Sequence, residues 1–318
     1  MINLRYHIVS LVAVFLALAI GVVVGSTALK EGTVSVLRAT SNRLISESEA
    51  ARAKNRDLEG EVAGYREFGT AILPSLVRDR LKNQAVVVLD TDRVDDKTRK
   101  PVEDAIKAAG GSVEGRVTFA SDRLSLAAEG DRTALGALLQ TDQTNPEALR
   151  QELVAKLAER LTTPARLPPG GVARSRDAIT GLQQAKFLAD LRADKSVQNG
   201  TVPFPRAGST FVIIGPTDNP TLLDPKLFLV PLAQRLSGRG STSVVGVEAS
   251  APGAPSWVEV LRDDQDLTDR VSTVDDVDRV PGQFALVEAL ARSLRSEPTG
   301  QYGFKSGATG LLPEGVAA

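Results

Sequence analysis

Hydrophobic residues form one uninterrupted run near the start of the chain, and no charged residue occurs from Ile8 to Gly25. A helix over this run would be about 27 Å long, close to the hydrocarbon thickness of a bilayer. A signal peptide has a shorter apolar core of about 7 to 15 residues, followed by a cleavage site with small residues. The best match to such a site, Ala17 to Ala19, lies inside the run. We therefore expect residues 1–28 to hold an uncleaved transmembrane anchor.

Gly21 and Gly25 are candidates for pairing two such anchors. A G-x-x-x-G pattern lets helix backbones approach closely in lipid, although a chance spacing in a span rich in small residues explains it too. His7 lies just before the run, and we interpret it as a polar residue at the membrane interface. The Lys and Arg residues beside the span do not determine its orientation, but long following domains translocate largely regardless of charge.

Two series of residues spaced by seven follow the apolar run. The first series is Leu37, Leu44, Ala51, Leu58 and Tyr65, and the second is Val34, Ser41, Ser48, Asn55 and Val62. They fit the d and a positions of a coiled coil, in which an Asn at an a position often sets the register. The polar residues in the a series weaken this seam. We predict a coiled-coil helix over residues 29–72 that joins two copies, with a single amphipathic helix lying on its own domain as the alternative.

Beyond residue 73, short apolar runs alternate with helical patterns. The runs are Ala85–Asp90, Ser112–Phe119, Thr210–Pro216 and Ser243–Ser250. The helical patterns cover Lys100–Ala109, Pro146–Leu161, Ser175–Leu191, Pro225–Leu236 and Gln283–Leu294. Continuous apolar strands that alternate with helices indicate a parallel sheet covered on both faces. The predicted fold is therefore α/β, with a transmembrane helix, a coiled-coil stalk and a mainly parallel, Rossmann-like domain.

We place this α/β domain at residues 73–300. Pro- and Gly-rich stretches near 162–171 and 198–208 are candidate boundaries between two lobes. Residues 301–318 are expected to be a flexible tail, because this end of the chain is rich in glycine.

Composition removes several classes of function. The 318 residues include 38 Lys and Arg against 39 Asp and Glu, so the net charge of -1 gives no field that would recruit nucleic acid. There is no Cys, and the single His and single Met are His7 and Met1. This excludes thiol chemistry, a zinc cluster and a His-dependent catalytic triad beyond the membrane end. We expect no cofactor and no metal site.

Asp90, Gly215 and Glu248 lie at or directly after the ends of predicted strands, at the rim where parallel α/β sheets bind ligands. The stretch VVVLDTDRV resembles the nucleophile motif of haloacid-dehalogenase-type phosphatases. The resemblance implies Asp90 as the nucleophile and Asp92 as the acid/base beside Mg²⁺, with residues 275–276 as the later acidic pair. The motif is short and acidic loops are common, so we interpret these residues as a solvated loop and expect no enzyme.

Carboxylates also cluster in Arg262–Asp269 and Ser272–Asp278. Such clusters could bind a hard cation. Their spacing matches no EF-hand loop, and Asp is favoured just before the helix that Pro281 is expected to open. We therefore interpret them as a solvated acidic face or as charges at helix N-termini.

Three stretches carry a resemblance to a known family: the first 26 residues, MINLRYHIVSLVAVFLALAIGVVVGS, the later STVDDVDRVPGQFALVEAL and the terminal GQYG. In these stretches, and in their order, the chain resembles the actinobacterial envelope proteins grouped with mycobacterial copper transport protein B. The resemblance implies a single-pass inner-membrane protein with a coiled coil and an α/β domain outside the cytoplasm. It also implies copper efflux or tolerance, or membership of a septal complex whose coiled coil stimulates a peptidoglycan hydrolase during cell separation.

The residues bear unequally on these two roles. One apolar span offers no lined path for an ion, and no soft ligand lies beyond His7. A heptad stalk is a surface that a partner helix can recognise. The sequence thus favours a non-enzymatic, dimeric scaffold or regulator in the inner membrane, with a peptidoglycan hydrolase or a second septal protein as partner. Copper homeostasis is the alternative, and a Mg²⁺-dependent phosphatase is a distant one.

Overall fold

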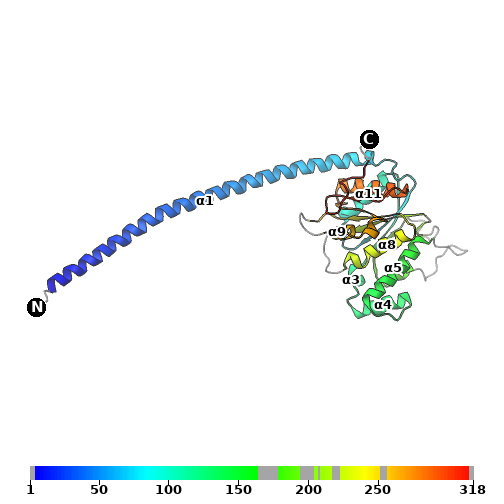
Figure 1. The fold of residues 1–318 in the computed structure, drawn as a ribbon, viewed down its shortest axis with the longest axis horizontal. Helices are drawn as coiled ribbons and strands as arrows, with labels where there is room; N and C mark the ends of the chain where they lie inside the picture. The colour runs from blue at the N-terminus through cyan, green and yellow to red at the C-terminus, as the bar shows by residue number, and fades with distance from the viewer. Residues whose placement is uncertain are drawn as a thin grey trace. The chain divides into compact units, whose positions relative to one another are not determined.

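The computed structural model of the protein describes residues 4–163, 178–193, 204–206, 208–216, 223–250 and 256–314. The chain divides into two compact units, Met1–Tyr65 and Arg66–Ala318. The first unit is helical, and the second is an α/β domain (Figure 1). The unit boundary lies within a helix, and not at residue 72 where the sequence placed it.

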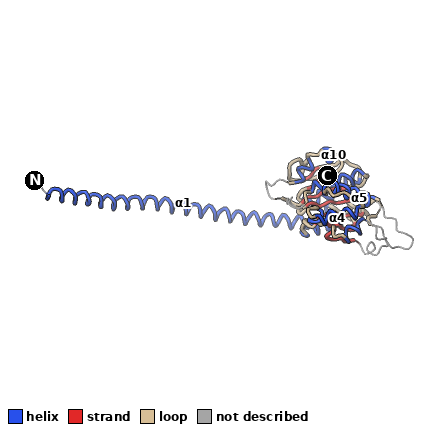
Figure 2. Tube along the Cα trace, turned by 90° about the horizontal axis from the view of Figure 1, so that it is seen from below, coloured by secondary structure: helices blue, strands red, loops and turns tan. Residues whose placement is uncertain are grey.

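Helix α1 runs from Leu4 to Leu76 as one continuous element, which Figure 2 shows as an unbroken coil. Its segment Tyr6–Gly25 has a mean hydropathy of 2.9 over 20 residues and is not buried by the rest of the chain. Among the described residues, this is the one segment long and apolar enough to cross a membrane. Pro74 lies inside the last turn of the helix, which ends at Leu76.

The predicted stalk, residues 29–72, is helical throughout. No break separates it from the apolar segment, so the anchor and the stalk are parts of one helix. The structure contains one copy of the chain, and the coiled-coil pairing of this helix stays a prediction.

A seven-stranded sheet with the order β3-β2-β1-β4-β5-β6-β7 forms the centre of the second unit. Its strands are β1 (Ala85–Thr91), β2 (Ser112–Phe119), β3 (Leu188–Ala193), β4 (Thr210–Gly215), β5 (Ser243–Val247), β6 (Ser272–Val274) and β7 (Gln301–Tyr302). All neighbouring strands are parallel except the β2–β3 pair. The mainly parallel α/β fold is therefore confirmed.

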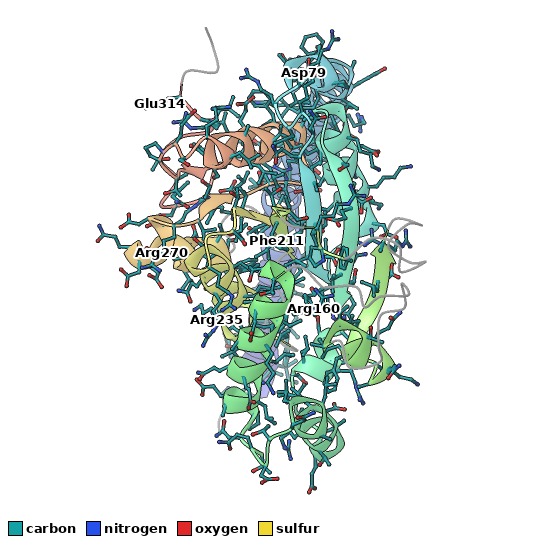
Figure 3. The ribbon with its side chains drawn as sticks, turned by 90° about the vertical axis from the view of Figure 1, so that its right-hand side faces the viewer. Asp79, Arg160, Phe211, Arg235, Arg270 and Glu314 are labelled. Carbon is teal, nitrogen blue, oxygen red and sulfur yellow. The ribbon has the colours of Figure 1, made fainter. Side chains whose placement is uncertain are left out.

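Helices cover both faces of this sheet (Figure 1). They are α2 (Asp96–Ala108), α3 (Ser121–Leu124), α4 (Glu129–Leu139), α5 (Pro146–Thr162), α6 (Ala178–Gln184), η1 (Pro225–Leu227), α8 (Leu229–Gly238), α9 (Trp257–Arg262), α10 (Gln265–Thr268) and α11 (Val280–Leu294). Alternate residues of β1 belong to two different buried clusters: Val86 and Val88 pack with α2 and α11, whereas Val87 and Leu89 pack with α4, α5 and α8. Phe211, labelled in Figure 3, belongs to the second cluster.

Strand β3 corrects the sequence prediction. The pattern over Ser175–Leu191 predicts one helix, whereas α6 ends at Gln184 and β3 begins at Leu188. Lys186 between them has a φ of 60°, which a helix cannot accommodate. The backbone of Leu188–Ala193 pairs with β2 instead, so tertiary pairing overrides the local helical pattern.

The C-terminal region also differs from expectation. Gln301 and Tyr302, predicted to start a flexible tail, pair with β6, and the Thr309 N–H donates to the Gln301 carbonyl over 2.7 Å. The α/β unit thus continues past residue 300. The proposed lobe boundaries fall largely on residues outside the described ranges, and Arg66–Ala318 group as one unit.

The last turns of α1 belong to the α/β unit. Leu73 and Val77 are buried with the residues of α2 and α11. A side chain added at Gly69 would lie 3.1 Å from Val280 Cγ1, so α1 and α11 approach closely there. Arg80, which follows α1, forms a 2.9 Å ion pair with Glu288 of α11. The base of the helix is thereby packed into the domain core.

Candidate functional site

The first candidate site is the face of α1 that carries the predicted heptad. Leu37 and Leu44 are 69% and 60% exposed, which is far from the usual burial of leucine. Ala51, Asn55, Leu58, Val62 and Tyr65 are exposed as well, and the side chain of Val34 lies outside the described residues. A row of large exposed apolar side chains marks a surface for another macromolecule.

The same face of α1 is slightly hollowed. A shallow groove along the helix is lined by Leu37, Ser41, Leu44 and Ser48, among others. These four residues are successive d and a positions of the predicted heptad. The groove is also lined by residues beside the seam, which are Thr40, Ile45, Glu49 and Arg52. In a coiled coil, knobs of a facing helix insert between a and d residues, so this groove is a candidate contact surface for a second helix.

Gly21 and Gly25 lie closer to the N-terminus of α1, in the apolar segment. Apart from the helix's own neighbouring backbone, no atom of the described residues lies within 4 Å of the position that a Cβ would occupy at either glycine. Pairing of this part of the helix with a second anchor stays a prediction. His7 is exposed on the same helix.

The second candidate site is the carboxyl edge of the sheet. From β1 the chain continues through α2 to β2 on one side, and from β4 it continues through α8 to β5 on the other. Doubly wound sheets bind ligands in the crevice where the strand order reverses in this way. Asp90, Gly215 and Glu248 lie at the carboxyl ends of β1, β4 and β5, as the sequence predicts.

The D-x-D motif does not form an accessible phosphatase site. Asp90 is completely buried, and its Oδ2 accepts a hydrogen bond of 2.6 Å from Arg99 Nε. Burial raises the pKa of this carboxyl group, and the positive charge of Arg99 opposes the rise. Asp92 is exposed and accepts from the Ser121 N–H at 3.1 Å. The Asp90 carboxylate is thus enclosed in the interior, in an ion pair with Arg99.

Trp257 covers the end of β4. A side chain of any size at Gly215 would overlap the indole ring of Trp257, so only glycine fits this position. The indole Nε1–H donates to the Pro216 carbonyl at 3.0 Å, and Trp257 is buried. The backbone at the reversal point of the sheet therefore lies against the protein's own aromatic ring.

The beginning of α2 is also occupied by protein groups. The Asp95 carboxylate caps α2 by accepting from the Lys97 N–H at 2.9 Å. The Asp95 N–H itself donates to Glu248 Oε1, also at 2.9 Å. Asp96 adds a third carboxylate in the first turn. Helix N-termini attract anions, and these side chains already supply that negative charge.

The two acidic stretches serve mainly to cap helices and tie loops together. Asp264 caps α10 through the Leu267 N–H at 3.2 Å, and Asp278 accepts from the Ala249 N–H at 2.7 Å. Asp276 is buried, which raises the pKa of its carboxyl group. Within the described part of the chain, no group of three His, Cys, Asp or Glu residues could hold a metal ion. The cap at α10 agrees with the interpretation as helix N-terminal charges. The second stretch corrects it, because Asp275 and Asp276 are buried and α11 has Arg279 at its N-cap and no acidic residue in its first turn.

Sequence reasoning missed the two residues that organise this edge. Arg262 appears among acidic residues in the sequence, but its side chain is fully buried and forms a 2.9 Å ion pair with Asp275. Trp257 is the single Trp of the chain, but no local sequence pattern links it to Gly215 at the rim. Neither contact is local in sequence, and the signals in the sequence are a basic residue in an acidic stretch and a lone aromatic residue after a Pro-rich stretch.

Comparisons with known proteins relate the whole chain to one family. Residues 1–313 match the family described as copper transport outer membrane protein, MctB. The relative named copper transporter MctB in Mycobacterium tuberculosis H37Rv is 26% identical over 316 residues, covering 97% of this chain and 98% of the relative. Its namesake in Mycobacterium leprae is 28% identical over 320 residues, covering 98% and 99%. The chain therefore belongs to the MctB family of copper transport proteins.

Proposed function

We propose that this protein is a membrane-anchored component of copper homeostasis in the cell envelope. The match of residues 1–313 to a copper transport family is the observation that carries this proposal. Relatives named copper transporters align over nearly their full length, so the anchor, the stalk and the α/β domain are all shared with them. This favours the copper alternative over the scaffold role that the residues alone suggested.

The donor set limits what the chain can do with copper as its cargo. Cu(I) prefers thiolate, thioether and imidazole ligands. The sequence has no Cys, its Met is Met1 and its His is His7, so the α/β domain contributes only oxygen and nitrogen donors of other kinds. These residues do not fit a Cu(I) site. We propose that the chain supports copper handling through a partner, without itself holding Cu(I) in the domain.

The proposed mode of action is non-enzymatic association. The exposed face of α1 from Leu37 to Tyr65 supports a homodimeric stalk, since its apolar residues otherwise stay in water. The burial of Asp90 supports the absence of phosphatase activity. An ion-conducting or ion-binding partner in the membrane would then recognise the paired helices.

The family description names the outer membrane, whereas we propose the inner membrane with the α/β domain outside the cytoplasm. A single apolar α-helix of 20 residues supports this location. Separation of inner and outer membrane fractions tests it. The full chain should be found with inner-membrane markers and be resistant to salt extraction, and recovery with outer-envelope markers would contradict the proposed location.

The experiment that tests the copper proposal is a deletion of the gene in its host, followed by measurement of cellular copper and of growth in added copper. The deletion should change both, and the full chain should restore them. A chain of residues 29–318, without the anchor but exported by a heterologous signal, is the matched control and should not restore them. Unchanged copper content and tolerance would refute the copper role.

A second candidate function is a scaffold in cell separation that activates a peptidoglycan hydrolase. The exposed apolar face of α1 favours it, because such a face suits a protein partner as well as a second copy. Affinity capture from membranes, with the intact chain and with a chain lacking residues 34–68, would test it. Capture of a hydrolase by the intact chain alone, with a separation defect and normal copper content in the deletion strain, would support this second candidate over the first.

A further inference from the structure

The reversal point of the sheet has the topology of a ligand site but is filled by protein. Gly215 ends β4 beside β1, where a doubly wound sheet opens its crevice. The ring of Trp257 lies directly against the Gly215 backbone and is hydrogen-bonded to Pro216. A planar aromatic side chain therefore lies where the topology would admit the ring of a ligand.

Both the backbone and the side chain of Trp257 are fixed by contacts within the domain. Its backbone begins α9, which starts with a capping box between Ser256 and Glu259. Glu259 also accepts from the Ser306 N–H at 3.2 Å, which links α9 to the segment after β7. Val258 and Leu261 bury the rest of α9 in the core. The indole is thus a fixed part of the fold.

The helix N-terminus that would bind a phosphate in such a crevice is also occupied by side chains of the protein. Dinucleotides place their pyrophosphate at the N-terminus of the helix after the first strand. Here that helix is α2, and the carboxylates of Asp95, Asp96 and Glu248 surround its first turn. A phosphate group would have to displace a carboxylate and then lie beside two more. Both halves of a nucleotide site are therefore filled by side chains of this chain.

We propose that Trp257 is a resident plug of the crevice at the carboxyl end of β4. With Trp257 in place, the α/β domain binds neither nucleotides nor dinucleotides, and its Rossmann-like sheet serves as a rigid body. The space that the ring fills accepts one class of ligand when the ring is removed, a planar aromatic the size of indole. This inference concerns the α/β domain alone and goes beyond the proposed function in copper homeostasis.

The chain reports on this site directly, because Trp257 is its only tryptophan. We would record the tryptophan emission of the full-length protein in detergent during titration with NADH, ATP and FAD at millimolar concentration, with corrections for their absorbance. The emission spectrum and the midpoint of thermal unfolding should not change. A shift in emission together with a higher midpoint would show an accessible crevice and would overturn the proposal.

Removal of the ring gives the positive test. The Trp257→Gly variant should unfold at a lower temperature than the wild type, and added indole should raise its midpoint by several degrees while leaving the wild type unchanged. The Trp257→Phe variant is the matched control and should respond to indole less than Trp257→Gly. Equal responses in wild type and Trp257→Gly would mean that the ring fills no defined space, which contradicts the plug.

A second variant keeps the test decisive if Trp257→Gly does not fold. In Gly215→Ala the added methyl group must displace the indole, so quenching of Trp257 emission by acrylamide should increase at least twofold. Val230→Ala, which alters a half-buried residue of α8, is the control and should leave the quenching unchanged. Unchanged quenching in Gly215→Ala would show that Trp257 does not lie against β4 in solution and would overturn the proposal.

Discussion

Arg262 makes the most heavily bonded contact at the carboxyl edge, and its replacement by leucine should destabilise the α/β unit strongly. The guanidinium group donates to Thr273 Oγ1 at 2.9 Å, to Asp275 Oδ2 at 2.9 Å and to the Tyr302 carbonyl at 2.7 Å. Asp275 also accepts from the backbone N–H groups of residues 304 and 305. The ion pair thus connects α9 and β6 to the segment that follows β7.

The expected magnitude follows from burial. The side chains of Arg262 and Asp275 are 0% and 2% exposed, so removal of the arginine leaves a carboxylate in the interior without its partner. Breaking a buried pair from one side costs about 3 to 5 kcal/mol. For a unit of this size, each kcal/mol lowers the unfolding midpoint by about 2 to 4 °C. The Arg262→Leu variant should therefore unfold about 6 to 20 °C below the wild type.

Tryptophan emission of the full-length protein in detergent is the appropriate assay, because Trp257 lies on the same helix as Arg262. Arg270→Leu, the same change at an exposed position, is the control and should shift the midpoint by less than about 2 °C. The double variant Arg262→Leu with Asp275→Leu should be more stable than Arg262→Leu alone, since it removes the isolated charge. A shift in Arg262→Leu as small as that of the control would refute the reasoning.

Two further predictions concern α1 and the pH dependence of stability. The combined changes Leu44→Asp and Leu58→Asp should convert a dimeric full-length protein to monomers in sedimentation experiments, because each Leu buried in the seam contributes about 1.5 to 3 kcal/mol. The control Arg56→Ala lies outside the seam and should leave the dimer intact. A wild-type protein that is monomeric would contradict the predicted seam. Burial raises the pKa of Glu288 above its ordinary value of 4.5, and Arg80 opposes the rise. Between these two pKa values the folded state holds a proton that the unfolded state has lost, so this group lowers the free energy of unfolding as pH rises through that window. Glu288→Gln should flatten this fall in pH-dependent denaturation, and an unchanged slope would contradict the assignment.

The parts of the fold that the sequence predicts are those with a strong local pattern. Strands β1, β4 and β5 are nearly continuous apolar runs because both of their faces are buried. Strand β2, with the sequence SVEGRVTF, is more polar but is also buried over its last six residues. Strand β3, with the sequence LADLRA, has no such run, since it lies at the edge of the sheet and is partly exposed. Strands β6 and β7 are only three and two residues long, too short for any period to emerge.

The candidate site shows the same limit. The rim positions at 90, 215 and 248 follow from strand ends, which are local features. That Trp257 lies on Gly215, and that Arg262 pairs with Asp275, depends on where α9 packs across the sheet. Charges in the sequence predict solvent exposure by default, so a buried ion pair inside an acidic stretch could not be distinguished from a solvated face. The heptad spacing on α1 is a local feature of the sequence, and the pairing of this helix with a second one stays a prediction.

The central claim is that this member of a copper transport family supports copper handling without binding Cu(I) in its own α/β domain. The most direct test is a competition titration of the full-length protein in detergent against a chromophoric Cu(I) chelator of high affinity, under reducing and anaerobic conditions. A His7→Ala variant, which lacks the single imidazole of the chain, separates the membrane end from the domain. The account predicts that this variant takes no Cu(I) from the chelator. Capture of one equivalent by the variant would place a Cu(I) site in the domain and contradict the account.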